Sequence, residues 1–175
     1  MLFRSAKEYL DKALAIRIQI GDKKGEASCY GSLGAVFQSL GEYVRAEVYL
    51  DKALTIARDI GDLDEEFVVL CVLTMVKLCQ GKIQEAFHCL TLSISKNESL
   101  RSFLRDNDDF KISFSDVRDF PYRNLSAFFC FFGNPSHALY VLELARARAL
   151  ADLMASQYSV ERQISVDPQI GRAHV

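Results

Sequence analysis

Apolar residues recur every three to four positions along most of the chain, which is the spacing of one face of an α-helix. In the first such segment the apolar face carries Tyr9, Leu10, Ala13, Leu14 and Ile16. Glycines interrupt the pattern at positions 21, 41, 61 and 81. Glycine fits the position that ends a helix, and the aspartates at 22 and 62 fit the cap of the next one. The pattern therefore predicts a series of helices joined by short turns.

One segment of the chain occurs twice. Residues 6–22 and 46–62 are identical at 11 of 17 positions, at an offset of 40 residues. A further 40 residues on, residues 81–90 repeat the frame of residues 41–50 more loosely. Each period contains two predicted helices in antiparallel order. Because one such pair cannot bury its apolar face alone, the pairs are expected to stack on one another.

The residues within a period resemble the tetratricopeptide repeat, whose pattern is aromatic-x2-Leu-Gly-x2-aromatic, then Ala-x3-aromatic or Leu, then Ala. The first copy consists of Tyr30, Leu33, Gly34, Phe37, Ala46, Leu50 and Ala53. The second copy keeps Ala86 and Leu90, but its first half has Leu70, Leu73, Thr74 and Lys77. The last copy has Tyr122, Leu125, Ser126, Phe129, Ala138, Leu142 and Ala145. The resemblance implies an all-α fold of TPR-like helical-hairpin repeats, stacked as a right-handed α-solenoid.

The matches divide the chain into six predicted segments. These are the second helix of a truncated repeat (1–20), a complete repeat (21–60), a degenerate repeat (61–98), an insertion (99–118), a terminal repeat-like helix pair (119–158) and a tail (159–175). The insertion is expected to form one short helix near residues 97–105 and then a loop. The last six residues, 170–175, can be encoded by a common sequencing adapter, so we expect them to be an assembly artefact.

A closer resemblance is carried by residues 110–165, which are similar to the terminal repeats of the tetratricopeptide repeat protein 28 family of animal proteins. The resemblance as a whole spans residue 6 to about residue 169. In that family a repeat array precedes a caspase-like CHAT domain. The signature lies in residues 110–114, 119–122, 133–135 and 145–157. The resemblance implies that the chain is a fragment, in which the first half-repeat lacks its partner helix and the CHAT domain is absent.

The composition excludes several classes of partner. Half of the 175 residues are apolar, a quarter are charged and the net charge is -2, so nothing favours nucleic acid or an anionic membrane. The most apolar stretch, residues 67–79, is broken by Thr74 and Lys77 and is too short to span a bilayer. The start of the chain lacks a signal-peptide core, so we expect a cytoplasmic protein. Its five cysteines are expected to be reduced thiols packed in the core: Cys29, Cys71, Cys79, Cys89 and Cys130.

Two features of the sequence resemble chemical sites. His88 and Cys89 are the only adjacent pair of their kind, but neighbours on a helix point about 100° apart, so we expect the thiol to pack and the imidazole to face outward. Asp106, Asp108 and Asp109 lack the remaining ligands of a calcium loop. The sequence therefore predicts no catalytic residue, no metal and no cofactor.

The remaining candidate site is a partner-binding groove along the first helix of each pair. The resemblance places these residues in it: Ser28, Gly31, Ala35, Gln38, Val68, Cys71, Met75, Leu78, Phe120, Arg123, Asn124, Ala127 and Cys130. Repeats that bind a peptide carboxylate carry Lys, Arg and Asn here, and only Arg123 with Asn124 fits. An apolar groove suits an apolar or helical segment of a protein partner. The alternative is that the insertion or the tail fills the groove.

The predicted function is a protein–protein interaction scaffold without catalysis. The alternative is a regulatory repeat segment that positions a downstream CHAT domain. Truncation of the first repeat would leave an apolar face open, so self-association through residues 1–20 is also expected.

Overall fold

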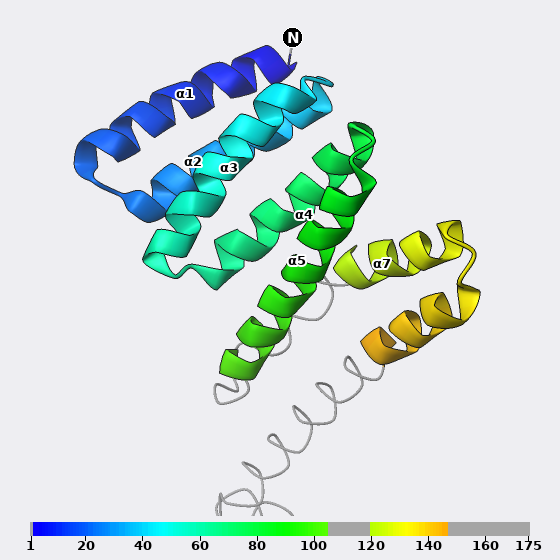
Figure 1. Cartoon of the computed structure of the whole chain (residues 1–175). Helices are drawn as coiled ribbons and strands as arrows, with labels where there is room; N and C mark the ends of the chain where they lie inside the picture. The colour runs from blue at the N-terminus through cyan, green and yellow to red at the C-terminus, as the bar shows by residue number, and fades with distance from the viewer. Residues whose placement is uncertain (1, 105–119, 147–175) are drawn as a thin grey trace, which may run out of the picture. The chain divides into compact units, whose positions relative to one another are not determined.

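The computed structural model describes residues 2–104 and 120–146 of the chain. The described residues are helices joined by turns, without a strand, and they fall into two units, Met1–Leu100 and Arg101–Val175. Figure 1 shows the helices of each unit. The two units are treated one at a time below.

The first unit is built from successive antiparallel helices separated by turns of two or three residues (Figure 1). In chain order they are α1 (Leu2–Ile20), α2 (Lys23–Ser39), α3 (Tyr43–Ile60), α4 (Leu63–Cys79) and α5 (Ile83–Leu104). α2 contacts α1, α3 and α4, so each hairpin packs on its neighbour. The predicted all-α fold of stacked TPR-like hairpins is confirmed.

The turns depend on glycines, because they require a backbone conformation that only a residue without a Cβ adopts easily. Gly21 and Gly61 have φ angles of 74° and 70°, in the left-handed region. The aspartate after each glycine then caps the next helix: Asp22 accepts a hydrogen bond from the Gly25 N–H at 2.9 Å, and Asp62 accepts one from the Glu65 N–H at 3.1 Å. Both the glycine ends and the aspartate caps are as predicted from the sequence.

α2 and α3 approach each other closely at Gly34. A Cβ added to Gly34 would lie 2.5 Å from Cγ of Leu50, which is closer than two non-bonded carbon atoms approach each other. Ala46, Leu50 and Ala53 of α3 are fully buried, as is Leu33 of α2. The residues that repeat in the sequence are therefore the residues that bring the two helices of a hairpin together.

α5 differs from the prediction near its C-terminal end. It continues without a break to Leu104, so the short separate helix expected near residues 97–105 is not formed. The buried face of α5 simply continues along it: Ala86, Leu90 and Ser93 are fully buried. Lys96 of α5 also pairs with the buried Glu66 of α4 at 2.8 Å. No turn interrupts the helix between this pair and Leu104. Residues 105–119 of the expected insertion lie outside the described residues.

The second unit contains α7 (Phe120–Phe131) and a helical segment at residues 135–146, joined by a turn. Gly133 in this turn has a φ of 73°, and the Asn134 N–H donates to the Phe129 carbonyl at 2.8 Å. Ala138 is buried, while Leu142 and Ala145 are half-buried. The helix was expected to reach about residue 157, and the part beyond 146 lies outside the described residues, as does the predicted tail.

The packing at α3 gives a first test. Ala46→Arg should unfold the first unit, because a buried unpaired charge costs several kcal/mol, comparable with the ~5–15 kcal/mol that hold a domain folded. Lys12→Ala, at an exposed position of α1, should change the free energy of unfolding by less than ~0.5 kcal/mol. Thermal unfolding followed by circular dichroism compares the two variants. Equal melting temperatures would contradict the packing.

The difference between α1 and α3 gives a second test. Five residues of α3 are buried, whereas none of residues 5–20 of α1 is. The backbone amides of Ser5–Ile20 should therefore exchange hydrogen faster than those of Tyr43–Ile60, because helix α1 opens with less loss of packing. Native-state hydrogen exchange measures both segments in one sample, and stronger protection in α1 would show that its packing has been underestimated.

Candidate functional site

The first helices of the two repeats in the first unit, α2 and α4, present the predicted groove residues at or near the surface. Val68 is 47% exposed, and Cys71, Met75 and Leu78 on the same helix are half-buried. On α2, Ser28 is exposed, and Ala35 and Gln38 are half-buried. The four groove side chains on α4 are apolar, so this surface offers dispersion and burial rather than specific hydrogen bonds.

Gly31 has a different role from an open groove position. A Cβ added there would lie 2.9 Å from Oε1 of Glu65 and 3.6 Å from Cγ2 of Val69. Gly31 thus lies where α2 and α4 pack on each other. Its lack of a side chain permits this approach, which sets the spacing of the two first helices.

Charged residues surround the start of these two helices. Lys24 of α2 pairs with Asp62, the cap of α4, at 2.9 Å. Burial alone would raise the pKa of Asp62, but the hydrogen bonds from Lys24 and from backbone N–H groups outweigh it and lower the pKa. Burial, reinforced by the neighbouring carboxylates, raises the pKa of Glu65. The surface is therefore acidic at this end and apolar toward Met75.

The groove residues predicted from the last repeat belong to the second unit. Phe120, Arg123, Ala127 and Cys130 are exposed there. Asn124 donates one N–H of its side-chain amide to the Phe120 carbonyl at 2.7 Å, so one of its two donors is engaged within α7. Arg123 and Asn124 are the only groove residues that fit a carboxylate clamp, and this bond makes Asn124 less suited to that role. A single groove running over both units stays a prediction.

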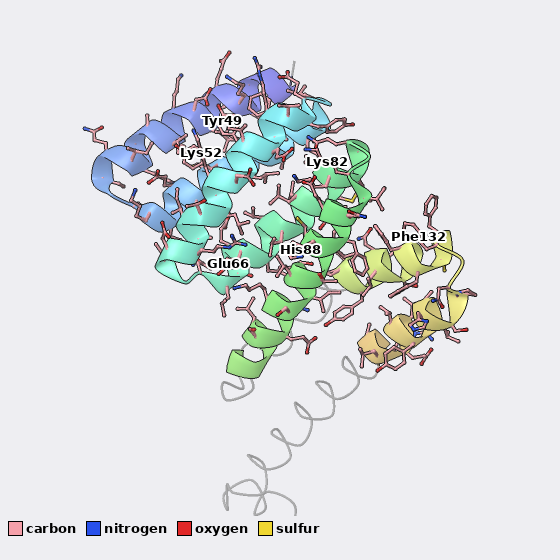
Figure 2. All side chains as sticks on the ribbon, in the orientation of Figure 1. Tyr49, Lys52, Glu66, Lys82, His88 and Phe132 are labelled. Carbon is pink, nitrogen blue, oxygen red and sulfur yellow. The ribbon has the colours of Figure 1, made fainter. Side chains whose placement is uncertain are left out.

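On the other side of α2, an aromatic cluster joins it to α3. The rings of Phe37 and Tyr49 are stacked with centroids 5.1 Å apart, and the Tyr30 ring lies 6.1 Å from that of Tyr49. Two cations cover the cluster: Arg45 lies 5.8 Å from the Phe37 centroid, and Lys52 lies 5.4 Å from that of Tyr30. Lys52 also lies 5.9 Å from the Tyr49 centroid, and both of these residues are labelled in Figure 2.

The next repeat replaces this cluster with an ion-pair network. Forty positions on, Lys77 stands in place of Phe37 and Glu85 in place of Arg45. Lys77 is 9% exposed, and its Nζ contacts the Glu85 carboxylate and lies 2.5 Å from Oε1 of Glu47. Gln80 and Lys82 donate to the other oxygen of Glu47 at 2.9 and 3.2 Å. The cation–ring contact of the first repeat is replaced by a cation–anion contact in the second. The cation also changes helix: it is Arg45 on the second helix of the first repeat, and Lys77 on the first helix of the second repeat.

The network determines the protonation of its members. Burial would raise the pKa of Glu47, but hydrogen bonds from Lys77, Gln80 and Lys82 outweigh it and lower the pKa to about 2. Burial would lower the pKa of Lys77, and the two carboxylates raise it well above its ordinary value. Both groups are therefore charged at neutral pH, and the buried cation is compensated.

A cleft of about 420 Å³ opens beside this network, between α3, α4 and α5. Its floor is apolar and includes Leu70, Leu73 and Leu92, and His88 and Cys89 also line it. Burial raises the pKa of the Cys89 thiol. A nucleophilic cysteine needs a lowered pKa, so the environment of Cys89 disfavours its thiolate form.

The cysteines as a group are less buried than predicted. Cys29 is buried, and Cys71 and Cys89 are half-buried. Cys79 and Cys130 are exposed, so the prediction that all five pack in a core is wrong for these two. Both lie in the last turn of their helices, where the buried face ends.

Within residues 2–104 and 120–146, no group of three or more His, Cys, Asp or Glu side chains could hold a metal ion. The three aspartates at 106, 108 and 109 lie outside that part of the chain. Among the described helices, none is long and apolar enough to cross a membrane.

Comparison with protein families agrees with this geometry. Residues 3–59, which span α1 to α3, match the model of a tetratricopeptide repeat. None of the curated proteins matches the chain. The match supports a TPR protein, and the narrower similarity to the TPR–CHAT family stays a prediction.

Sequence reasoning missed the partners of Lys77. The signal was present, because a lysine at an aromatic position of the repeat must be compensated if it is buried. Glu85 could have been found as the residue eight positions on, the same spacing that joins Phe37 to Arg45. Glu47 is 30 positions away and belongs to the preceding repeat, so only the stacking of α3 on α4 reveals it.

The lowered pKa of Glu47 predicts a pH-dependent contribution to stability. Because the folded-state pKa lies near 2, below the ordinary 4.5, the charged form stabilises the fold above about pH 4.5, and this stabilisation is lost as the pH falls toward 2. Glu47→Gln should cost ~1–3 kcal/mol at pH 7, and the difference from wild type should shrink at pH 2.5.

Denaturant unfolding at the two pH values measures this difference. Glu8→Gln, at an exposed position of α1, is the matched control and should stay within ~0.5 kcal/mol of wild type. A cost of Glu47→Gln that is the same at both pH values would show that the ion pairs contribute nothing to it.

Proposed function

We propose that the chain is a TPR-type protein–protein interaction scaffold that carries out no catalysis itself. The observation that supports this most is the apolar surface of α4, with Val68, Cys71 and Met75 at or near the surface of a helix that is otherwise packed on both neighbours. The tetratricopeptide match over residues 3–59 adds that the repeat is of a non-catalytic, protein-binding type. The raised pKa of Cys89 argues against thiol chemistry.

The partner we propose is an apolar or helical protein segment. Its apolar side would lie on Cys71, Met75 and Leu78, and a basic end would suit the acidic start of α4 at Asp64 and Glu65. A free carboxylate terminus is a poorer fit, since the Asn124 amide is engaged within its own helix. Neither nucleic acid nor a membrane is proposed as a partner, and the proposed location is the cytoplasm.

The alternative function is a regulatory segment that positions a downstream CHAT domain. The resemblance of residues 110–165 to TPR–CHAT proteins supports it. So does the apolar surface of the second unit, where Phe131 is 83% and Tyr140 65% exposed. A downstream sequence with a separated His and Cys in an α/β pattern would favour this alternative over the scaffold.

Two substitutions test the scaffold proposal. Met75→Glu places a charge on the apolar surface, where desolvation opposes binding, and should reduce the recovery of bound partners at least several-fold. Cys89→Ser changes a residue of the second helix and should leave recovery intact. The experiment is affinity capture from cell extract by wild type and both variants, followed by quantitative mass spectrometry, with folding checked by circular dichroism.

The pattern of outcomes separates the proposals. Loss of capture in Cys89→Ser but not in Met75→Glu would refute the groove on α2 and α4. A wild-type chain that captures nothing would refute the scaffold and favour the alternative.

A further inference from the structure

The cleft of about 420 Å³ between α3, α4 and α5 is separate from the groove on α2 and α4. No residue of the predicted groove lines it, and its volume falls within the ~300–1,000 Å³ of small-molecule sites. α4 forms the floor with Leu70 and Leu73, which are buried, and α3 adds Leu54. The cleft therefore offers apolar contact to a ligand that enters between the second helices of two successive repeats.

Helix α3 places opposite charges at the two ends of this cleft. Asp51 and Arg58 both line it, and they lie seven positions apart in the chain. Seven residues make two helical turns, so both lie on one side of α3 with about 10 Å of helix between them. Because α3 and α4 are antiparallel, Asp51 lies toward Lys77, and Arg58 lies toward the start of α4, with its Nε 3.8 Å from Oε2 of Glu66.

The Asp51 end has one negative charge in excess. Within the described residues, the carboxylate of Asp51 has no hydrogen bond or ion pair. Its neighbours are already paired, since Lys77 contacts both Glu47 and Glu85. Lys82 is the second cation here, 3.2 Å from Glu47, so two lysines compensate three carboxylates. Burial, reinforced by Glu47, raises the pKa of Asp51, and a cation supplied by a ligand would stabilise its charged form.

The Arg58 end has one positive charge in excess. Glu66, labelled in Figure 2, is 3% exposed, and its carboxylate lies 2.8 Å from Nζ of Lys96. Lys96 thus compensates the buried carboxylate, while Arg58 lies farther from it and has a side chain that is 52% exposed. The guanidinium of Arg58 is therefore available to an anion, which it can hold through two parallel N–H donors.

We propose that the cleft binds an elongated small molecule with an apolar middle, a cationic group at the Asp51 end and an anionic group at the Arg58 end. An unbranched ω-amino acid has this form. In 8-aminooctanoate an extended chain of eight bonds separates the two charges by about 10 Å, which matches the separation along α3. This site is distinct from the proposed protein-binding surface, because α3 and α5 supply its charged rim.

The probe for the site is 8-aminooctanoate, titrated into the ¹⁵N-labelled full chain and followed by NMR. We expect saturable shifts of backbone amide signals within residues 51–58 and 84–92, which border the cleft. Octanoate and octylamine, kept below their micellar concentrations, each lack one charged group. Both should bind about two- to fivefold more weakly, which is the size of a partly exposed ion pair.

Two substitutions assign the two ends separately. Asp51→Asn should weaken 8-aminooctanoate and octylamine about two- to fivefold without weakening octanoate. Arg58→Gln should weaken 8-aminooctanoate and octanoate by the same factor without weakening octylamine. Both side chains are exposed, so the variants should fold as wild type does, which circular dichroism checks. The matched controls are Asp59→Asn and Lys12→Gln, which remove exposed charges outside the cleft and should leave binding unchanged.

Three results would overturn the proposal. One is the absence of saturable shifts within the two segments, and another is equal affinity for 8-aminooctanoate, octanoate and octylamine. The third is a response to Asp51→Asn and Arg58→Gln that does not depend on which charge the compound carries. Met75→Glu should bind 8-aminooctanoate as wild type does, so failure of the groove proposal and failure of this one are distinguishable.

Discussion

The close approach of two helices at Gly34 is the contact on which the first unit depends. A Cβ at this position would lie 2.5 Å from Leu50, so the absence of a side chain sets how near α3 comes to α2. That distance brings Ala46 and Leu50 out of water and places Tyr49 against Phe37. Interiors are close-packed, so a change in the spacing of one hairpin must be absorbed by its neighbours. The glycine turns then return the chain at the right point for the next hairpin.

The second hairpin shows how far the pattern can change while the packing survives. Thr74 takes the position of Gly34, is fully buried, and satisfies its hydroxyl by donating to the Leu70 carbonyl at 2.8 Å. Lys77 takes the position of an aromatic ring and is held by two carboxylates. Compared with an apolar interior such a network adds little stability, since desolvation offsets much of the attraction, but loss of one charge leaves its partners uncompensated. Its value lies in fixing α3, α4 and α5 against each other, because each of the three helices supplies one of its charges.

The first unit has exposed apolar side chains on two helices, α4 and α1, and the two surfaces differ in how they arise. α4 has half-buried apolar side chains beside the exposed Val68. Such a surface suits a partner segment that is already helical. The face of α1 around Tyr9 is instead the uncovered half of a contact that the chain completes elsewhere. The two surfaces lie on different helices, and one can be altered without the other.

Local sequence determined the helices, their glycine ends, the caps at Asp22 and Asp62 and the repeat that pairs them. These features depend on neighbours within a few residues and on a segment that recurs at an offset of 40 residues. Tertiary structure decided the rest. It shows α5 as one helix to Leu104, held to α4 near its C-terminal end by the pair of Lys96 with Glu66. It also places Gly31 against α4 and Glu47 beside Lys77. Both contacts join one repeat to the next, and no pattern of neighbouring residues encodes a contact between residues so far apart in the sequence.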